Sequence, residues 1–206
     1  MYTLYGWKLS GSLATEAALS EAGQEFEIVP VNIGADEQHT EEFGRINPRR
    51  QLPAMRLPDG SVITEGAAML LHLADAAPKA KLAPEPGSPA RAQHDRWLLF
   101  LAVNVYEGEL RKLRSERYTT EAGCADSVKK AAFAYVDRHY KLLNDAIDVG
   151  PYFFGEEFTV LDIYIWMLAQ WMDVDWLSHE CPKVKRLADA VAARPKVAPI
   201  HAFHFG

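Results

Sequence analysis

Apolar and polar residues in the first part of the chain follow strand spacing and helix spacing by turns. Short runs with every second residue apolar indicate strands, whereas apolar residues recurring three and four positions apart indicate helices. In chain order, the segments with these patterns are 2–5 (strand), 13–22 (helix), 26–31 (strand), 43–46 (helix), 54–57 and 62–63 (strands), and 67–76 (helix). The turn sequence Pro58-Asp59-Gly60 joins the last two strands into a hairpin. The predicted order of elements is therefore β-α-β-α-β-β-α.

The second part of the chain has helical spacing only. Helices are expected over residues 90–114, 122–148 and 183–193, and another begins at Thr159. With Thr159 as the N-cap, Asp162 occupies the third helical position, which is the arrangement of a capping box. Because this capping role accounts for an acid within an apolar run, we interpret Asp162 as structural. The predicted fold class is a small α/β domain followed by an all-α helical bundle.

Charge and proline content divide the chain at the same place. Residues 1–77 hold 5 Lys/Arg and 11 Asp/Glu, a net charge of −6, whereas residues 78–206 hold 17 of each. Residues 78–89 contain four prolines, which block a helix and stiffen an extended connection. We therefore expect a first domain over 1–77, a linker over 78–89 and an all-helical domain over 90–206.

Composition argues against several classes of protein. With 49% hydrophobic and 24% charged residues, the chain has the balance of a soluble globular protein. Its two cysteines, Cys124 and Cys181, form no CxxC pair, which argues against a disulfide scaffold or a dithiol oxidoreductase. A net charge of −6 without a long basic run argues against nucleic acid or an anionic membrane as a partner. The longest apolar run, residues 97–103, is too short to span a membrane, and no export signal is visible, so we expect a cytoplasmic protein.

Four short stretches, in this order and on this pattern of elements, resemble the soluble glutathione transferases. They are Leu9–Ser12 before the first helix, Asn47–Pro53, Thr64–Gly66 at the start of the third helix, and Phe158–Asp162 in the helical part. The resemblance spans nearly the whole chain. It implies a thioredoxin-like N-terminal domain, a C-terminal helical domain, glutathione as co-substrate, a small hydrophobic electrophile as second substrate, and a homodimer.

The catalytic hydroxyl that the resemblance implies belongs to Ser10 or Ser12. Catalysis needs the thiolate of glutathione, and a free thiol has a pKa of about 8.5. A hydroxyl that donates to the sulfur, at a helix N-terminus with its partial positive charge, favours the ionised form. Ser10 stands where serine-type members place this donor, whereas Ser12 lies two residues later and can share or replace the role. Either serine can also serve only as a helix cap, and Gly11 stands where bacterial cysteine-type members carry cysteine.

The resemblance assigns the glutathione peptide to the segment that contains Pro53. This proline is expected in cis, a form almost confined to X–Pro bonds, so that the backbone of Leu52 meets the cysteinyl amide of glutathione. Gln51 is expected near the glycyl end of the tripeptide. Arg50 replaces a glycine common in the family, and either grips a carboxylate or is simply solvated.

The γ-glutamyl end of glutathione is assigned to the start of the third helix. Glu65 is placed to bind the ammonium group, and the helix N-terminus beside it suits the carboxylate. Gly66 replaces a Ser or Thr common in the family, whose hydroxyl holds that carboxylate. The lost hydrogen bond to a charged group is worth about 1.5–3 kcal/mol, so we expect weak affinity for glutathione.

The second substrate and the C-terminal tail are less constrained by the sequence. The expected electrophile-site residues are Trp7, Lys8, Asn104 and Tyr106. Tyr106 can polarise a bound electrophile, although an aromatic residue at helical spacing more often belongs to the core. His201 and His204 lack a third ligand, so we expect no metal and a tail that packs on the cleft.

The sequence therefore predicts a serine-type bacterial glutathione S-transferase that conjugates glutathione to hydrophobic electrophiles, a detoxification reaction. Two alternatives stay open. The same thiolate can support glutathione-dependent isomerisation, reductive dehalogenation or ether cleavage. The fold also serves as a non-catalytic binding module: Arg50 and Gly66 keep that alternative open, whereas Ser10, Pro53 and Glu65 favour an enzyme.

Overall fold

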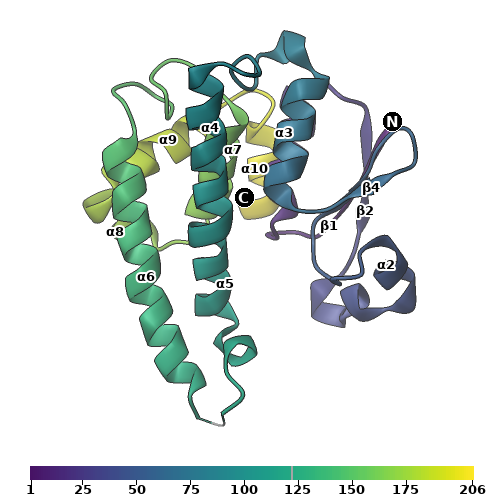
Figure 1. Cartoon of the computed structure of the whole chain (residues 1–206), viewed down its shortest axis with the longest axis vertical. Coiled ribbons are helices and arrows are strands. Elements are labelled where there is room, and N and C mark those ends of the chain that lie inside the picture. Colours follow the sequence, from purple (N-terminus) through teal and green to yellow (C-terminus); the bar gives the residue numbers. More distant parts are fainter. Residues whose placement is uncertain (122) are drawn as a thin grey trace. The chain divides into compact units, whose positions relative to one another are not determined.

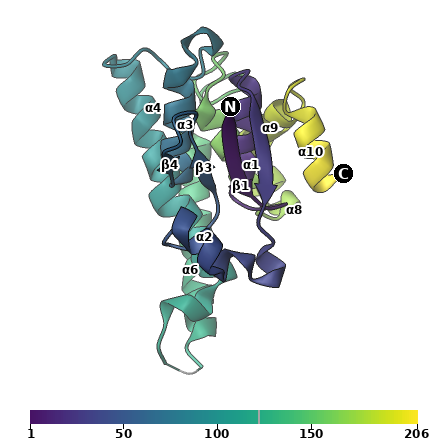
Figure 2. The same ribbon diagram turned by 90° about the vertical axis from the view of Figure 1, so that its right-hand side faces the viewer.

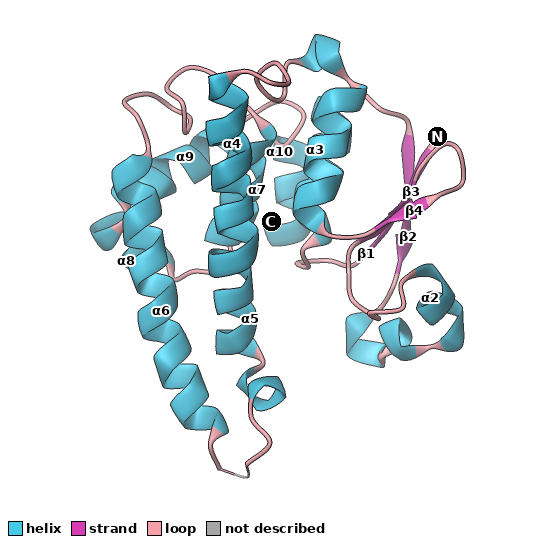
Figure 3. Ribbon diagram, viewed as in Figure 1, coloured by secondary structure: helices cyan, strands magenta, loops and turns pink. Residues whose placement is uncertain are grey.

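The computed structural model describes residues 1–121 and 123–206 of the chain. These residues group into two compact units, of which the first comprises residues 1–84 together with 191–206 and the second residues 85–190. The strands β1 to β4 all lie in the first unit, and helices make up most of the second (Figure 3).

A four-stranded sheet in the order β2-β1-β3-β4 forms the centre of the first unit (Figure 1). Its strands are β1 (Tyr2–Gly6), β2 (Phe26–Pro30), β3 (Ala54–Arg56) and β4 (Val62–Ile63). β1 pairs in parallel with β2 and antiparallel with β3, which pairs antiparallel with β4. α1 (Ser12–Glu21) makes the crossover that a parallel pair requires, and α3 (Gly66–Ala76) follows the hairpin. This is a thioredoxin-like arrangement.

The two faces of the sheet carry different helices. Successive side chains along a strand point to opposite faces. On one face, the hydroxyl of Tyr2 lies 3.3 Å from Nε2 of His72 in α3, which packs beside α1. On the other, Tyr5 meets the ring of Phe43 edge-on, and Phe43 belongs to α2 (Glu41–Ile46) (Figure 2). Three short 3-10 helices complete the connections: η1 (Ile33–Ala35), η2 (Glu37–His39) and η3 (Pro78–Ala80).

The C-terminal segment, residues 191–206, belongs to the first unit and not to the helical domain over 90–206 that the sequence suggested. Arg194 pairs with the buried carboxylate of Glu21 at the end of α1, with 2.7 Å between Nε and Oε1. α10 (Ala198–Phe205) then packs on α1 (Figure 2). Helical spacing shows that a segment is a helix, but it does not show against which body the helix packs.

Helices form the second unit. They are α4 (Pro89–Phe100), η4 (Leu101–Tyr106), α5 (Glu107–Leu113), η5 (Ser115–Tyr118), α6 (Ala125–Ala146), α7 (Val160–Ala169), α8 (Val174–Glu180) and most of α9 (Pro182–Ala192). α4, η4 and α5 follow one another without a break, and η4 is π-helical where regular spacing predicted an ordinary helix over 90–114. α6 packs along α5 (Figure 1). Residue 122, where the predicted second helix begins, lies outside the described residues.

The core of the second unit is α7, in which every residue is buried. The predicted capping box at its start is confirmed. Oδ2 of Asp162 accepts the N–H of Thr159 at 2.7 Å and its hydroxyl at 3.0 Å, while Oδ1 accepts the N–H of Phe153 at 2.7 Å. Burial raises the pKa of Asp162 to about 6, against the lowering by these donors. The predicted fold class, thioredoxin-like followed by all-helical, is confirmed.

Candidate functional site

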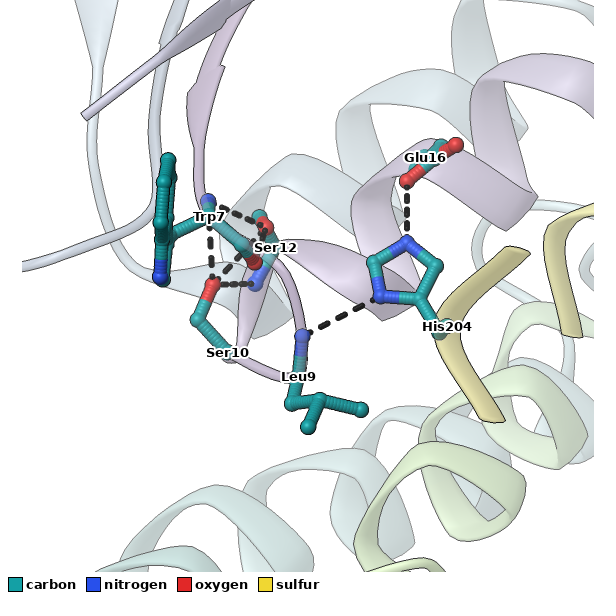
Figure 4. A network of polar contacts seen from close by, with 6 residues as sticks. All are labelled: Trp7, Leu9, Ser10, Ser12, Glu16 and His204. Carbon is teal, nitrogen blue, oxygen red and sulfur yellow. Dashed lines mark hydrogen bonds and ion pairs between the residues drawn. The ribbon is translucent and has the colours of Figure 1, made fainter. Parts of the chain in front are cut away.

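Two serine hydroxyls meet at the loop between β1 and α1. Oγ of Ser10 lies 2.8 Å from Oγ of Ser12 (Figure 4). The N–H of Trp7 points at both oxygens, at 3.4 Å and 3.3 Å, and the N–H of Ser12 donates to Oγ of Ser10 at 3.2 Å. The strand end and the first turn of α1 therefore hold both hydroxyls in place.

The proton count separates the two serines. A hydroxyl has one proton to donate. Ser12 is 3% exposed, and its hydroxyl donates to the backbone oxygen of Trp7 at 3.2 Å. Ser10 is partly exposed and accepts from two backbone N–H groups. The proton of Ser10 can thus turn from Oγ of Ser12 towards an incoming acceptor, while the contact between the two oxygens keeps the Ser10 side chain in place.

Strained backbone is concentrated near these candidates. Five non-glycine residues have positive φ in the described part of the chain, and three of them are Leu9 (62°), Arg50 (55°) and Glu65 (68°). Each precedes or belongs to a stretch that the sequence singled out. A left-handed backbone costs an L-residue about 1–2 kcal/mol, and such strain clusters where a functional geometry must be kept.

The loop with the predicted peptide-binding residues is held by Asn47, which is buried. Its Nδ2 donates to the backbone oxygen of Gln51 at 2.7 Å, and its Oδ1 accepts the N–H of Arg49 at 3.0 Å. The Leu52–Pro53 peptide bond is cis, as the resemblance implied. Asn47 was quoted in the sequence motif without a role; its place at a helix end before proline was the available signal.

Arg49 and Arg50, neighbours in the chain, have different partners. The guanidinium of Arg49 contacts the carboxylate of Glu65, and that of Arg50 contacts the backbone oxygen of His39. Arg50, whose role the sequence left open, thus binds its own domain in this structure. Arg49, which the sequence did not single out, is the cation that the strained Glu65 faces.

The start of α3 is arranged to meet an anion. Glu65 is the N-cap residue, yet its side chain does not cap the helix, and Gly66 is the first helical residue. The first turn of α3 carries no acid. Backbone N–H groups at a helix N-terminus, with the positive end of the helix dipole, attract a carboxylate.

Two of the residues predicted for the electrophile site, Asn104 and Tyr106, belong to the second unit. Oδ1 of Asn104 accepts the hydroxyl of Tyr135 at 2.7 Å, and Nδ2 donates to the backbone oxygen of Phe100 at 3.2 Å. Tyr106 stacks on Tyr164, with 6.2 Å between ring centroids. Both residues belong to the π-helical segment η4, a feature that is frequent at functional sites and that periodicity does not reveal.

A buried ion pair of the second unit was missed altogether. Nζ of Lys112 lies 2.6 Å from Oε2 of Glu109, one turn earlier in the same helix, and both residues are buried. Burial raises the pKa of Glu109, and Lys112 opposes the rise. An acid and a base three residues apart are usual on a solvated helix face, so the spacing gave no sign of burial.

The described residues contain neither a group of side chains typical of a metal site nor a helix typical of a membrane span. Over ranges 1–121 and 123–206, no three or more His, Cys, Asp or Glu gather as a metal site would require. In the same ranges, no helix combines the length and apolarity needed to cross a bilayer.

Comparison with known families assigns the chain to a class. The family model described as "Glutathione S-transferase, N-terminal domain" matches residues 12–76, and that described as "Glutathione S-transferase, C-terminal domain" matches residues 125–199. The two matches together cover more than half of the chain. The chain therefore belongs to the glutathione S-transferase family of enzymes.

Individual relatives agree with this assignment. The GST-like protein YncG of Escherichia coli K12 is 30% identical, with 97% of this chain and 95% of YncG aligned. Maleylacetoacetate isomerase of Rattus norvegicus is 36% identical over 78% of this chain and 73% of its own. Among solved structures, a glutathione transferase homologue from Sulfitobacter with bound glutathione superposes with a TM-score of 0.90 at 29% identity, over 98% of both chains.

Proposed function

We propose that the protein transfers the thiolate of glutathione to a small hydrophobic electrophile, with Ser10 donating a hydrogen bond to the sulfur. The observation that carries the proposal is the ordered pair of hydroxyls at the start of α1, with 2.8 Å between the oxygens. Ser12 keeps Ser10 oriented, because its own proton is directed to Trp7. The glutathione-bound Sulfitobacter relative supports glutathione as the co-substrate.

The remaining groups bind the tripeptide. Glu65 and the N-terminus of α3 at Gly66 take the γ-glutamyl ammonium and carboxylate, while Arg49 neutralises Glu65 when the site is empty. The backbone of Leu52 beside Pro53 takes the cysteinyl amide, and Gln51 the glycyl end. Trp7 and Lys8 in the first unit, and Asn104 and Tyr106 in the second, remain our candidates for contact with the electrophile.

Ionisation of the thiol accounts for a small part of the catalysis. At pH 7, a thiol of pKa 8.5 is about 3% ionised and one of pKa 6.5 about 75%, a gain of about 25-fold in thiolate. Intrinsic nucleophilicity falls with the pKa, and with a Brønsted coefficient of about 0.45 a two-unit shift costs about eightfold. The net gain is about threefold. Positioning of the sulfur against the electrophile must therefore supply most of the acceleration.

Steady-state kinetics with glutathione and an aryl halide test the proposal. Ser10→Ala removes both the gain of about threefold from ionisation and the hydrogen bond that positions the charged sulfur, so kcat is expected to fall about 10- to 150-fold. Ser12→Ala acts through Ser10 and is expected to cost about 2- to 10-fold. Ser20→Ala is the matched control. Ser20 lies near the C-terminal end of α1, away from Ser10 and Ser12, and its hydroxyl donates to the backbone oxygen of Lys196. Equal kcat values for the wild type, Ser10→Ala and Ser12→Ala would contradict the hydroxyl mechanism.

A second candidate is glutathione-dependent isomerisation, favoured by the 36% identity to the rat isomerase. In that reaction glutathione adds to the substrate and leaves again, so it is not consumed. Incubation with a cis-enone diacid such as maleylacetoacetate, followed by assay of free thiol, separates the two reactions. A loss of thiol equal to product supports conjugation, and product formed at constant thiol supports isomerisation. A cytoplasmic homodimer acting in detoxification remains part of the proposal.

A further inference from the structure

His204, the third-last residue of the sequence, contacts the loop that precedes Ser10. Nδ1 of His204 lies 3.1 Å from the backbone nitrogen of Leu9, and Nε2 lies 3.0 Å from the carboxylate of Glu16 (Figure 4). His204 is 5% exposed, and the Glu16 side chain is 12% exposed. The imidazole therefore bridges the loop and α1 from a third element, α10.

The donors and acceptors fix the state of this imidazole. The backbone N–H of Leu9 can only donate, so Nδ1 of His204 accepts and carries no proton. The ring proton then lies on Nε2 and is directed to the carboxylate of Glu16. Glu16 thus favours the tautomer with the proton on Nε2, which leaves Nδ1 free to accept the N–H of Leu9. A carboxylate bonded to one ring nitrogen of a histidine commonly sets the tautomer in this way.

Leu9 needs this support because its backbone is strained. Its φ is 62°, in the left-handed region, and its side chain is 48% exposed, so burial of the side chain contributes little to holding it. The next residue is Ser10. A change in the backbone of Leu9 therefore rotates the peptide plane that leads into Ser10 and redirects its hydroxyl.

We infer that His204 is a positioning residue, which acts through the backbone of Leu9 to hold the Ser10 hydroxyl towards the glutathione sulfur. The inference rests on the proposed function, since it assumes that Ser10 faces the thiol. It makes the C-terminal helix part of the thiol-activating apparatus of the first unit.

The segment leading to α10 has contacts of its own with α1, separate from those of His204. Arg194 pairs with Glu21, and Nζ of Lys196 donates to the backbone oxygen of Glu21 at 3.1 Å. These contacts lie at the C-terminal end of α1, whereas His204 reaches the first turns of the same helix. α10 is therefore held along α1 at both ends.

Three substitutions of His204 separate its two contacts. In His204→Asn, the amide oxygen can take the place of Nδ1 and accept the N–H of Leu9. In His204→Gln, the amide nitrogen can take the place of Nε2 and donate to Glu16, but nothing replaces Nδ1. His204→Ala removes both contacts. Lys196→Ala is the control for a loosened α10, because it removes one contact with Glu21, leaves the Arg194–Glu21 pair and both His204 contacts in place, and touches neither Leu9 nor Ser10.

Two readouts are used on the full-length protein: the pKa of the glutathione thiol when bound, from thiolate absorbance against pH, and kcat with an aryl halide. His204→Ala and His204→Gln are expected to raise the thiol pKa by about one unit. Because the Ser10 hydroxyl then no longer positions the sulfur, they are also expected to lower kcat about tenfold, with the KM for glutathione changed less than about threefold. His204→Asn is expected to stay within about threefold of wild type in kcat. Lys196→Ala is expected to lower Tm without moving the thiol pKa.

The outcomes distinguish this inference from the function beneath it. The inference would be overturned if His204→Gln had the thiol pKa and kcat of the wild type while His204→Asn had those of His204→Ala. The contact with Glu16, and not that with Leu9, would then be the one that matters. An unchanged thiol pKa in His204→Ala, beside a raised one in Ser10→Ala, overturns the inference and leaves the function standing. No effect of Ser10→Ala overturns both, while hydrogen exchange of the Leu9 amide in wild type and His204→Ala still reports whether the contact exists without glutathione.

Discussion

Glu65 keeps its backbone at φ 68° and ψ 108°, a positive-φ conformation that costs a residue with a Cβ more than it costs glycine. Replacement by glycine relieves about 1–2 kcal/mol of strain and loses about 0.5–1 kcal/mol to the greater freedom of the unfolded chain. Replacement by alanine keeps the Cβ and the strain. Both variants lose the same exposed ion pair with Arg49, worth about 0–1 kcal/mol, which cancels in the comparison. Glu65→Gly should therefore be about 0.75 kcal/mol more stable than Glu65→Ala, the midpoint of a range of about 0–1.5 kcal/mol.

Glutathione affinity should fall equally in both variants, whatever the difference in their stability. Both variants lose the charged contact to the γ-glutamyl ammonium, so the Kd for glutathione is expected to rise about 10- to 150-fold in each. Thermal unfolding compares the variants, with Glu65→Gly melting about 1.5–3 °C above Glu65→Ala, and calorimetric titration gives the Kd. A glycine variant that melts below the alanine variant would refute the strain argument, and an unchanged Kd in either would refute the role of Glu65.

Three further substitutions test other parts of the structure. A Cβ at Gly6 would lie 2.5 Å from Oγ of Ser12, so Gly6→Ala should displace that serine and lower kcat about tenfold in the aryl halide assay, while far-UV circular dichroism stays unchanged. The pKa of Asp162 is raised from 3.8 to about 6, so the native state binds more protons than the unfolded state between these values. Stability therefore falls by about 3 kcal/mol in total as the pH rises from about 3 to about 7, and urea unfolding of Asp162→Asn should lack this fall. Lys112→Ala leaves the carboxylate of Glu109 buried and unpaired, which should cost about 3–5 kcal/mol in urea unfolding at pH 7 and less in acid; an equal cost at both pH values would contradict the pairing.

Local signals predicted most of the elements. The alternation along β1, the Pro-Asp-Gly turn after β3 and the capping box at Thr159 and Asp162 each depend on a few adjacent residues, so they can be recognised without knowledge of the rest of the fold. The cis bond before Pro53 came from the family resemblance and not from local physics. The serine pair was named for the same reason, but its proton arrangement depends on the backbone of Trp7 and needed the structure.

Long-range pairings could not be predicted. Arg194 and Glu21 are 173 positions apart, and nothing in the helical spacing of the C-terminal segment indicates that it joins the first unit. His204 likewise contacts Leu9 and Glu16, which lie near the other end of the sequence. The strain at Glu65 was also unforeseen, because the sequence there suggests only an acid at a helix start, and positive φ in a non-glycine residue is imposed by the surrounding structure.

The measurement that tests the central claim most directly is the pKa of the glutathione thiol bound to the wild-type protein, from thiolate absorbance across pH. The account predicts a value at least one unit below the ordinary thiol value of about 8.5, and a return towards that value in Ser10→Ala. Glutathione that binds with an unshifted thiol pKa, or does not bind at several millimolar, would contradict it.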